Sequence, residues 1–319
     1  MPKISVIIPV YNAEEFIEKC ISSVKEQTLT DFEIIFVNDF SQDQSVDIIK
    51  KQARLDNRIV LIDLDHNVGP MRAREYGYRK ASGDYIIFCD SDDTLPQRAL
   101  QQMYEKAIEK NADVVVGNVD YIHFDGSREL WTSHIEDNEH IDGLKALLRG
   151  EIRHNLVAKL FSKSLFVGLQ FESIKGLRYF EDYLLMYQLM SNAQKIAILD
   201  KTVYNYIQTK GSSTQLQMSD KRLDNIVLAH KEVYDILYPK MSLRRDLFAH
   251  NQLYFCRLLA QEPNIKKRLN QKLREFSLSH VMANAAIWKN NSFKSAVKLI
   301  VAKEVGPFLS CLLKWFGKL

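Results

Sequence analysis

Asp90, Asp92 and Asp93 place three carboxylates within four consecutive residues of the chain. Carboxylates this close repel one another unless a cation or a solvated loop accommodates them. Their oxygens are hard ligands that suit Mg²⁺ or Mn²⁺, and such an ion would in turn bridge substrate phosphates. Taken alone, however, the segment is explained more simply as an acidic turn before a helix that begins at Pro96, because short D-x-D strings are common.

Two further segments carry polar groups with more than one interpretation. Asp39 directly follows an apolar run and could accept hydrogen bonds from a base or a ribose, whereas Asp43 or Ser45 suits the cap of the next helix. Arg74 could pair with Asp90 or with a phosphate, and a surface arginine is the default alternative. Neither segment identifies a site by itself.

These side chains follow short apolar runs that alternate with amphipathic segments, a pattern that predicts strands alternating with helices. The expected strands are Ile4–Val10, Phe32–Val37, Ile59–Leu64, Tyr85–Cys89 and Asp113–Val119. The expected helices are Ala13–Gln27, one that begins over Gln44–Gln52, Pro70–Ala81 and Pro96–Asn111. Such alternation gives an α/β fold with a mostly parallel sheet flanked by helices, and ligands bind beyond the carboxyl ends of its strands. The loops with Tyr11-Asn12, Asn38-Asp39, His66-Asn67 and Asp90–Asp93 therefore converge on one edge.

The second half of the chain has a different pattern. Residues 127–142 are polar and predict an exposed loop, Gly143–Arg149 and Ser164–Phe166 predict helices or turns, and Tyr179–Met190 predicts a helix that begins with acids. Beyond Gln215 the pattern is one of long helices without strand signals. We therefore expect a catalytic domain over 1–215, with a nucleotide-binding half (1–100) and an acceptor half (101–215), and a helical region over 216–319.

Composition narrows the classes of function. Hydrophobic residues make up 46% of the 319 residues, enough for a sizeable core. The 43 basic and 40 acidic residues nearly cancel, which argues against a nucleic-acid-binding protein. The opening residues lack the features of a secretory signal, and no apolar stretch is long enough for a spanning helix, so we expect a cytoplasmic protein. Its scattered cysteines are expected to be reduced thiols: Cys20, Cys89, Cys256 and Cys311.

Four motifs, taken together, resemble the family 2 glycosyltransferases with the GT-A fold, in that family's order and at similar spacings. Two residues depart from the family pattern: Asn38 stands where aspartate is common, and Phe40 stands where glycine is common. The four segments are Val6–Asn12 (first strand and nucleotide loop), Asn38–Asp43 (D-D-G-S-x-D), Asn67–Arg74 (third motif) and Asp90-Ser91-Asp92 (metal-binding D-x-D).

The resemblance implies a nucleotide-sugar site at these positions. Asp39 would contact the uracil of a UDP-sugar, with Pro9 and Tyr11 against the base. Asp90 would lie near the ribose and the metal, and Asp92 would be the principal ligand of Mn²⁺ or Mg²⁺, which offsets the charge of the departing diphosphate. The full implied nucleotide-binding set is Pro9, Tyr11, Asn12, Asp39, Asn67, Arg74, Asp90 and Ser91.

An inverting transfer needs a carboxylate that removes the acceptor proton. Asp182 is similar to the aspartate of the family's E-D motif, which acts as the base, and Glu181 would orient the base or contact the acceptor. An acidic first helix turn, favoured by the helix dipole, is the alternative. Lys159 lies in an element similar to the family's K-L-[FY] and would touch the diphosphate or the carboxylates, or else be exposed.

Tyr204-Asn205-Tyr206 and the Gly-Ser stretch that follows resemble a segment that closes over the donor phosphates in the family. Lys210 would replace the arginines common there, and Ser212 is a further candidate phosphate contact.

The last segment, 289–319, combines six lysines and a single Glu304 with tryptophan and other apolar residues. This composition suits an interfacial helix on an anionic membrane. A helix packed on the catalytic domain or on a partner subunit suits it equally, and Gly306-Pro307 would divide it into two.

Other nucleotide-binding classes lack their motifs here. No G-x-G-x-x-G follows the first strand, as a dinucleotide-dependent oxidoreductase requires, and no G-x-x-x-x-G-K-[ST] is present. We therefore expect an inverting, metal-dependent hexosyl- or N-acetylhexosaminyltransferase that uses a UDP-sugar and a glycan or lipid-linked glycan acceptor in surface glycan biosynthesis. A non-catalytic sugar-nucleotide sensor or scaffold of the same fold is the alternative, disfavoured by the joint presence of Asp90, Asp92 and Asp182.

Overall fold

The computed structural model describes residues 2–137, 140–169, 177, 179–209 and 218–275. The chain divides into two compact units, Met1–Leu216 and Gln217–Leu319. Lys210, Ser212 and the segment 289–319, for which the sequence suggested phosphate and membrane contacts, lie outside the described residues.

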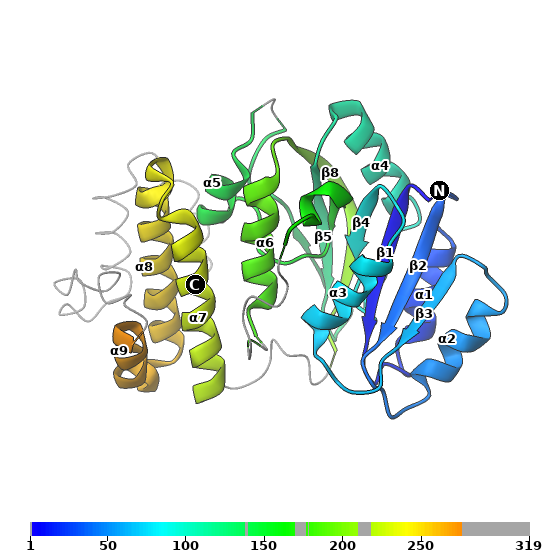
Figure 1. Ribbon diagram of the computed structural model, residues 1–319, viewed down its shortest axis with the longest axis horizontal. Helices are drawn as coiled ribbons and strands as arrows, with labels where there is room; N and C mark the ends of the chain where they lie inside the picture. The colour runs from blue at the N-terminus through cyan, green and yellow to red at the C-terminus, as the bar shows by residue number, and fades with distance from the viewer. Residues whose placement is uncertain (1, 138–139, 170–176, 178, 210–217, 276–319) are drawn as a thin grey trace. The chain divides into compact units, whose positions relative to one another are not determined.

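The first unit is built on an eight-stranded sheet in the order β3-β2-β1-β4-β7-β5-β6, with β8 also paired to β5. Strands β1 to β4 form a parallel half, whereas β7 runs antiparallel to both β4 and β5. The expected α/β fold is confirmed, with a mixed second half (Figure 1). The strands are β1 Ile4–Val10, β2 Phe32–Asn38, β3 Ile59–Asp63, β4 Tyr85–Phe88, β5 Val114–Ile122, β6 Arg128–Trp131, β7 Lys159–Ser162 and β8 Ile196–Ile207.

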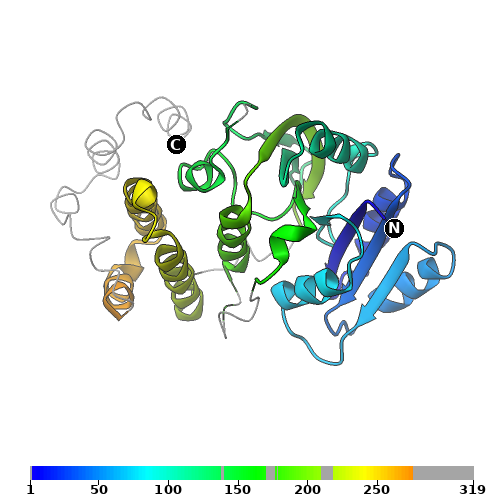
Figure 2. The ribbon, with the colours of Figure 1, turned by 45° about the horizontal axis from the view of Figure 1, so that its top comes forward.

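Helices cover both faces of this sheet. Figures 1 and 2 show α3 and α6 on one face and α1 and α4 on the other. The helices of this unit are α1 Ile17–Lys25, α2 Ser45–Ala53, α3 Pro70–Lys80, α4 Ala99–Lys110, α5 Gly143–Leu148 and α6 Glu181–Asn192, with a 3-10 turn η1 at Lys163–Phe166.

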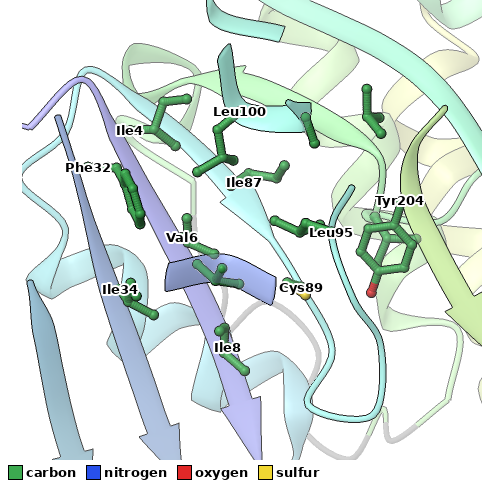
Figure 3. Close-up of a cluster of buried hydrophobic side chains, with 14 of the residues drawn as sticks. Ile4, Val6, Ile8, Phe32, Ile34, Ile87, Cys89, Leu95, Leu100 and Tyr204 are labelled. Atoms are coloured by element: carbon green, nitrogen blue, oxygen red, sulfur yellow. The ribbon is translucent and has the colours of Figure 1, made fainter. Parts of the chain in front are cut away.

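The core under α1 and α4 follows from the two-residue period of the strands. Ile4, Val6 and Ile8 of β1 point to the same face, where they meet Phe32 of β2 and Ile87 of β4 (Figure 3). Apolar positions of the two helices close this layer. Alternate residues of β1 and β2 are buried here, and those of β3 and β4 are buried or partly buried. A shift of register by one residue would move them out of this layer, so burial sets the register and with it the position of each strand end.

The exposed loop expected over residues 127–142 is wrong in part, because Arg128–Trp131 form β6. This short strand is mostly exposed at the sheet edge, so it lacks an alternating apolar pattern. Strands β7 and β8 were also not expected. In β8 the apolar pattern is interrupted at Asp200-Lys201, close to where its register with β5 shifts.

The second unit contains helices without a described strand. It comprises α7 Asp220–Leu237, α8 Arg244–Gln261 and α9 Lys266–Glu275, with 3-10 turns η3 Met241–Leu243 and η4 Pro263–Ile265. His230 of α7 and Asn251 of α8 are fully buried and share a hydrogen bond of 2.7 Å between Nδ1 and Oδ1. Within the part of the chain that the structure describes, no helix combines the length and apolarity needed to cross a bilayer.

The close approach of α3 to the sheet depends on Gly77. A Cβ at this position would lie 2.4 Å from Cγ2 of Ile7 and 3.2 Å from Cγ2 of Val37. We expect Gly77→Val to lower the free energy of unfolding by about 2 kcal/mol, because the helix must move away from β1 and β2. Urea denaturation measures this. The adjacent exposed substitution Tyr76→Val is the control, and equal stability of the two variants would contradict the proposed packing.

Candidate active site

Arg74 joins two parts of the chain that are distant in sequence. Its Nη2 donates to Oδ1 of Asp90 at 2.8 Å, and its Nη1 donates to Oδ1 of Asp182 at 3.1 Å. Only 6% of the arginine side chain is exposed, so the guanidinium is shielded by protein. The surface position considered from sequence is therefore wrong, and the pairing with Asp90 is confirmed. One cation thus draws together the acidic loop after β4 and the first turn of α6.

The two acids at the start of α6 have raised pKa values. Loss of hydration raises the pKa of Asp182, and Asp90 adds to this, while Arg74, Lys159 and the backbone N–H of Leu156 oppose it. For Glu181, burial and the neighbouring Asp182 raise the pKa to about 7. A carboxylate with a raised pKa is a stronger base and still ionises near neutral pH. The E-D pair therefore has the electrostatic properties that a proton acceptor needs.

Lys159 is buried next to this pair. Its Nζ donates to the backbone O of Asn155 at 2.7 Å, to Oδ1 of Asn155 at 2.8 Å and to the O of Val157 at 3.3 Å. Burial lowers its pKa to about 7, although the charge of Asp182 opposes the shift. The exposed position considered from sequence is wrong, and the ammonium group instead holds the segment before β7 beside Asp182.

Asp93 fastens the acidic loop to β8. Its carboxylate accepts hydrogen bonds from the hydroxyl of Tyr204 at 2.6 Å and from the N–H of Ile207 at 2.7 Å. The same hydroxyl accepts the N–H of Asp90 at 3.0 Å, and Tyr204 lies beside the loop that follows Cys89 (Figure 3). Burial, together with Asp90 and Asp92, raises the pKa of Asp93 well above its ordinary value. The sequence analysis did not predict this contact between Asp93 and Tyr204. The only indication in the sequence was Asp93 itself, a third carboxylate directly after the D-x-D motif.

Asp92 lies beside Asp90 with its Oδ2 accepting the hydroxyl of Thr209 at 3.1 Å. Burial and the charge of Asp90 raise its pKa, so a cation between the two carboxylates would relieve their repulsion. No group of three or more His, Cys, Asp or Glu in the described part of the chain is arranged to hold a metal ion. Asp90 and Asp92 fit Mg²⁺, which commonly takes one or two protein carboxylates and completes its shell with phosphates and water.

The loops after β1, β2 and β3 are tied together by Asp39 and Asn12. Both oxygens of the buried Asp39 carboxylate accept backbone N–H groups, from Val68 at 2.6 Å and Gly69 at 2.9 Å. Asn67 donates through Nδ2 to the O of Asp39 at 3.1 Å. Asp39 therefore organises the third loop through these hydrogen bonds. Its predicted contact with uracil would be made in addition to these bonds.

The remaining nucleotide candidates occupy the same edge. Pro9 is in β1, in register with Val37 of β2, and Tyr11 follows the end of the strand with an exposed ring. The N–H of Asn12 donates to Oγ of Ser41 at 3.0 Å, which joins the first two loops. Ser91 lies partly exposed between the two candidate metal ligands. The structure thus brings every described nucleotide candidate to the carboxyl ends of β1 to β4.

Comparison with known proteins identifies the family of the chain. The sequence model of Glycosyl transferase family 2 matches residues 5–166. The chain belongs to this family.

Individual relatives extend the match beyond the family region. The chain is 31% identical to the glycosyltransferase GlyA of Streptococcus pneumoniae over 93% of its own length but 43% of the length of GlyA. It is 29% identical to the glycosyltransferase EpsJ of Bacillus subtilis over 90% of its own length and 86% of that protein. A crystal structure of Staphylococcus aureus TarS 1-349 in complex with UDP-GlcNAc has a similar fold, with a TM-score of 0.63 and 24% identity over 73% of this chain and 67% of that one.

One of the two departures from the family 2 pattern has a structural reason. Asn38 is buried, and its Nδ2 donates to Oδ1 of Asp63 in β3 at 2.8 Å. An aspartate at position 38 would place two carboxylates together, so the amide suits this neighbour.

The other departure strains the backbone. Phe40 has a φ of 64° in the left-handed region, where a side chain costs roughly 1–2 kcal/mol that glycine avoids.

The hydrogen bond between Tyr204 and Asp93 predicts that Tyr204→Phe lowers the free energy of unfolding. The change removes the hydroxyl that satisfies both the Asp93 carboxylate and the Asp90 N–H, at a cost of about 1–3 kcal/mol. Chemical denaturation of the family 2 domain measures it. Tyr121→Phe on the neighbouring β5, where the ring stacks on Tyr206, is the matched control. A Tyr204→Phe protein as stable as this control would contradict the stabilising role of the Tyr204 hydroxyl.

Proposed function

We propose that this chain transfers a hexosyl or N-acetylhexosaminyl group from a UDP-sugar to a hydroxyl of a glycan or lipid-linked glycan, with inversion at the anomeric carbon. The observation that carries the proposal is the pairing of Arg74 with both Asp90 and Asp182. This pairing brings the loop of Asp90 and Asp92, the candidate diphosphate site, close to the candidate base Asp182. A single displacement requires the leaving group and the base to lie near the same anomeric carbon.

Known proteins support the choice of donor and setting. TarS has been crystallised with UDP-GlcNAc and with UDP, and it shares the fold of this chain. A poly(ribitol-phosphate) beta-glucosyltransferase of Bacillus spizizenii is 30% identical over 64% of the chain, which covers 32% of that protein. These relatives favour a hexose or N-acetylhexosamine donor and an acceptor in a surface polymer.

The proposed reaction assigns one role to each acid. The acceptor hydroxyl gives its proton to Asp182 while its oxygen bonds to the anomeric carbon, on the face opposite the departing UDP. The bond between that carbon and the β-phosphate oxygen breaks, and its electron pair leaves with UDP. Asp90 and Asp92 would hold Mg²⁺ or Mn²⁺, which offsets the charge of the diphosphate. Glu181 would orient Asp182 or contact the acceptor, and Arg74 holds Asp182 in place.

Substitution of the two key acids separates binding from catalysis. We expect Asp182→Asn to bind UDP as the wild type does but to release UDP from a UDP-sugar at least 100-fold more slowly, because the proton acceptor is lost. Asp92→Ala is expected to lose both activities, since its carboxylate would share the ion with the diphosphate. Calorimetry with UDP and Mn²⁺ and a UDP-release assay over a panel of nucleotide sugars measure these effects.

The exposed helical substitution Asp47→Asn is the charge-matched control. Wild-type protein that binds a nucleotide sugar but turns over none with any acceptor tested would favour the sensor alternative.

Opposite shifts in the pH–rate profile are expected from two substitutions around Asp182. Activity requires ionised Asp182, so it should rise with pH through the range in which the Glu181–Asp182 pair titrates, near 7 for Glu181. Arg74→Gln removes a cation that lowers the pKa of Asp182, and the acidic limb should move to higher pH. Glu181→Gln removes a neighbouring negative charge, and the limb should move to lower pH. Profiles of kcat measure both variants, and shifts in the same direction would refute the assignment of Asp182 as base.

A further inference from the structure

Two exposed aromatic rings follow adjacent strands at the edge where the candidate site lies. Strands β1 and β2 are parallel neighbours in register, with Val10 opposite Asn38. Tyr11 is the next residue after this pair on β1, and Phe40 lies two residues after it on β2. Their exposures are 54% and 44%, which is high for rings of this size beside a well-packed sheet.

The loop that carries Phe40 is bound on both sides. Before it, the carboxylate of Asp39 accepts two N–H groups of the next loop. After it, Ser41 donates its N–H to Oδ1 of Asn38 at 3.2 Å, and Gln42 donates its N–H to Oδ1 of Asn12 at 2.8 Å. Hydrogen bonds therefore fix the backbone on both sides of Phe40, and the residue itself remains 44% exposed.

The backbone conformation of Phe40 is unfavourable for a phenylalanine. Its φ of 64° lies in the left-handed region, which glycine adopts readily but which is sterically unfavourable for a residue with a Cβ. Exposure of the ring means that burial in the core does not offset this strain. A strained residue that the surroundings hold firmly, at the edge of a binding site, is the kind of outlier from which a function can be inferred.

The topology indicates which part of a ligand would meet the ring. Strand β1 lies between β2 and β4. The candidate ligands of a cation and diphosphate, Asp90 and Asp92, follow β4, whereas Phe40 follows β2 on the other side of β1. A nucleoside diphosphate with its phosphates near Asp92 would extend across the end of β1 and direct its base toward β2.

We propose that Phe40 is a stacking surface for the nucleobase of the donor, beside Tyr11, and that it contributes to nucleotide affinity. The inference rests on the proposed function, since it requires a nucleotide-sugar donor. A flat π-surface suits any base, and such a contact accounts for a bulky side chain at a strained, exposed position. In the proposed function the diphosphate binds near Asp90 and Asp92 after β4, so its binding should be unaffected by removal of the Phe40 ring.

The test compares two probes in isothermal titration calorimetry with the full chain. The first is whichever nucleoside 5′-diphosphate of a panel with UDP, GDP, dTDP and ADP the wild type binds best, with Mn²⁺ present. The second is inorganic pyrophosphate with Mn²⁺, which lacks a base. The variants are Phe40→Gly, which removes ring and strain, Phe40→Leu, which removes only the aromatic face, and Phe40→Tyr, which keeps it. Phe124→Leu, at a ring that is 55% exposed after β5, is the matched control.

We expect Phe40→Gly and Phe40→Leu to weaken nucleotide binding about tenfold, while pyrophosphate binding and the Phe40→Tyr and Phe124→Leu proteins stay at wild-type values. The melting temperature of Phe40→Gly should equal or exceed that of the wild type, because glycine relieves the strain. A ring needed only for folding would instead lower it.

Nucleotide binding by Phe40→Gly at wild-type strength would overturn the inference and leave the proposed function intact. Equal losses for nucleotide and pyrophosphate would overturn it as well, since they would indicate a damaged loop. A wild type that binds none of the nucleotides would overturn both the proposed function and the inference.

Discussion

The candidate site depends on one buried guanidinium shared between two carboxylates. Burial opposes the charge of Arg74, yet Asp182 and Asp90 hold its pKa above the ordinary value, and Glu181 contributes to the same effect. Three acids thus face one arginine, with the buried Lys159 close to Asp182. Burial raises the pKa values of Glu181 and Asp182, and the negative charge of neighbouring acids adds to this rise. An incoming cation and a proton are the two species that such a site accepts most readily.

The mixed half of the sheet explains why distant segments meet this site. Because β7 is antiparallel to both β4 and β5, strand β5 again points in the direction of β4, and β8 runs parallel to β5. The carboxyl end of β8 therefore reaches the edge where β4 ends. Tyr204 and Ile207 can then bind Asp93, and the two halves of the sheet meet at the acidic loop.

The sequence was most informative where burial imposes a simple period. Strand β1 was predicted to the residue, and β2 to β5 to within a few residues, because each contains a run of apolar residues that is buried or partly buried. Strand β6 is exposed at an edge, and the apolar pattern of β8 is broken at Asp200-Lys201, so neither was predicted. The predicted positions along the strand ends do gather at one edge, although their roles in binding remain predictions.

The contacts of single polar side chains were harder to anticipate than the strands. From the sequence, Arg74 and Lys159 fitted a surface position as well as a buried one, since an arginine or lysine among polar neighbours carries no local sign of burial. The partners that bury them, Asp182 and Asn155, are identified only by the fold. The same holds for Asp93, whose hydroxyl partner Tyr204 lies on a strand that the sequence pattern obscured.

The fastening of Asp93 to β8 has a consequence for how the protein is made. Strands β1 to β4 can pair once the first ninety or so residues have left the ribosome, but Tyr204 and Ile207 follow more than a hundred residues later. Until then the acidic loop lacks its anchors and Arg74 lacks Asp182. Contacts with such long separation form late in folding. A nascent chain therefore contains the parallel half of the sheet, with its candidate nucleotide contacts, well before the candidate active site is complete.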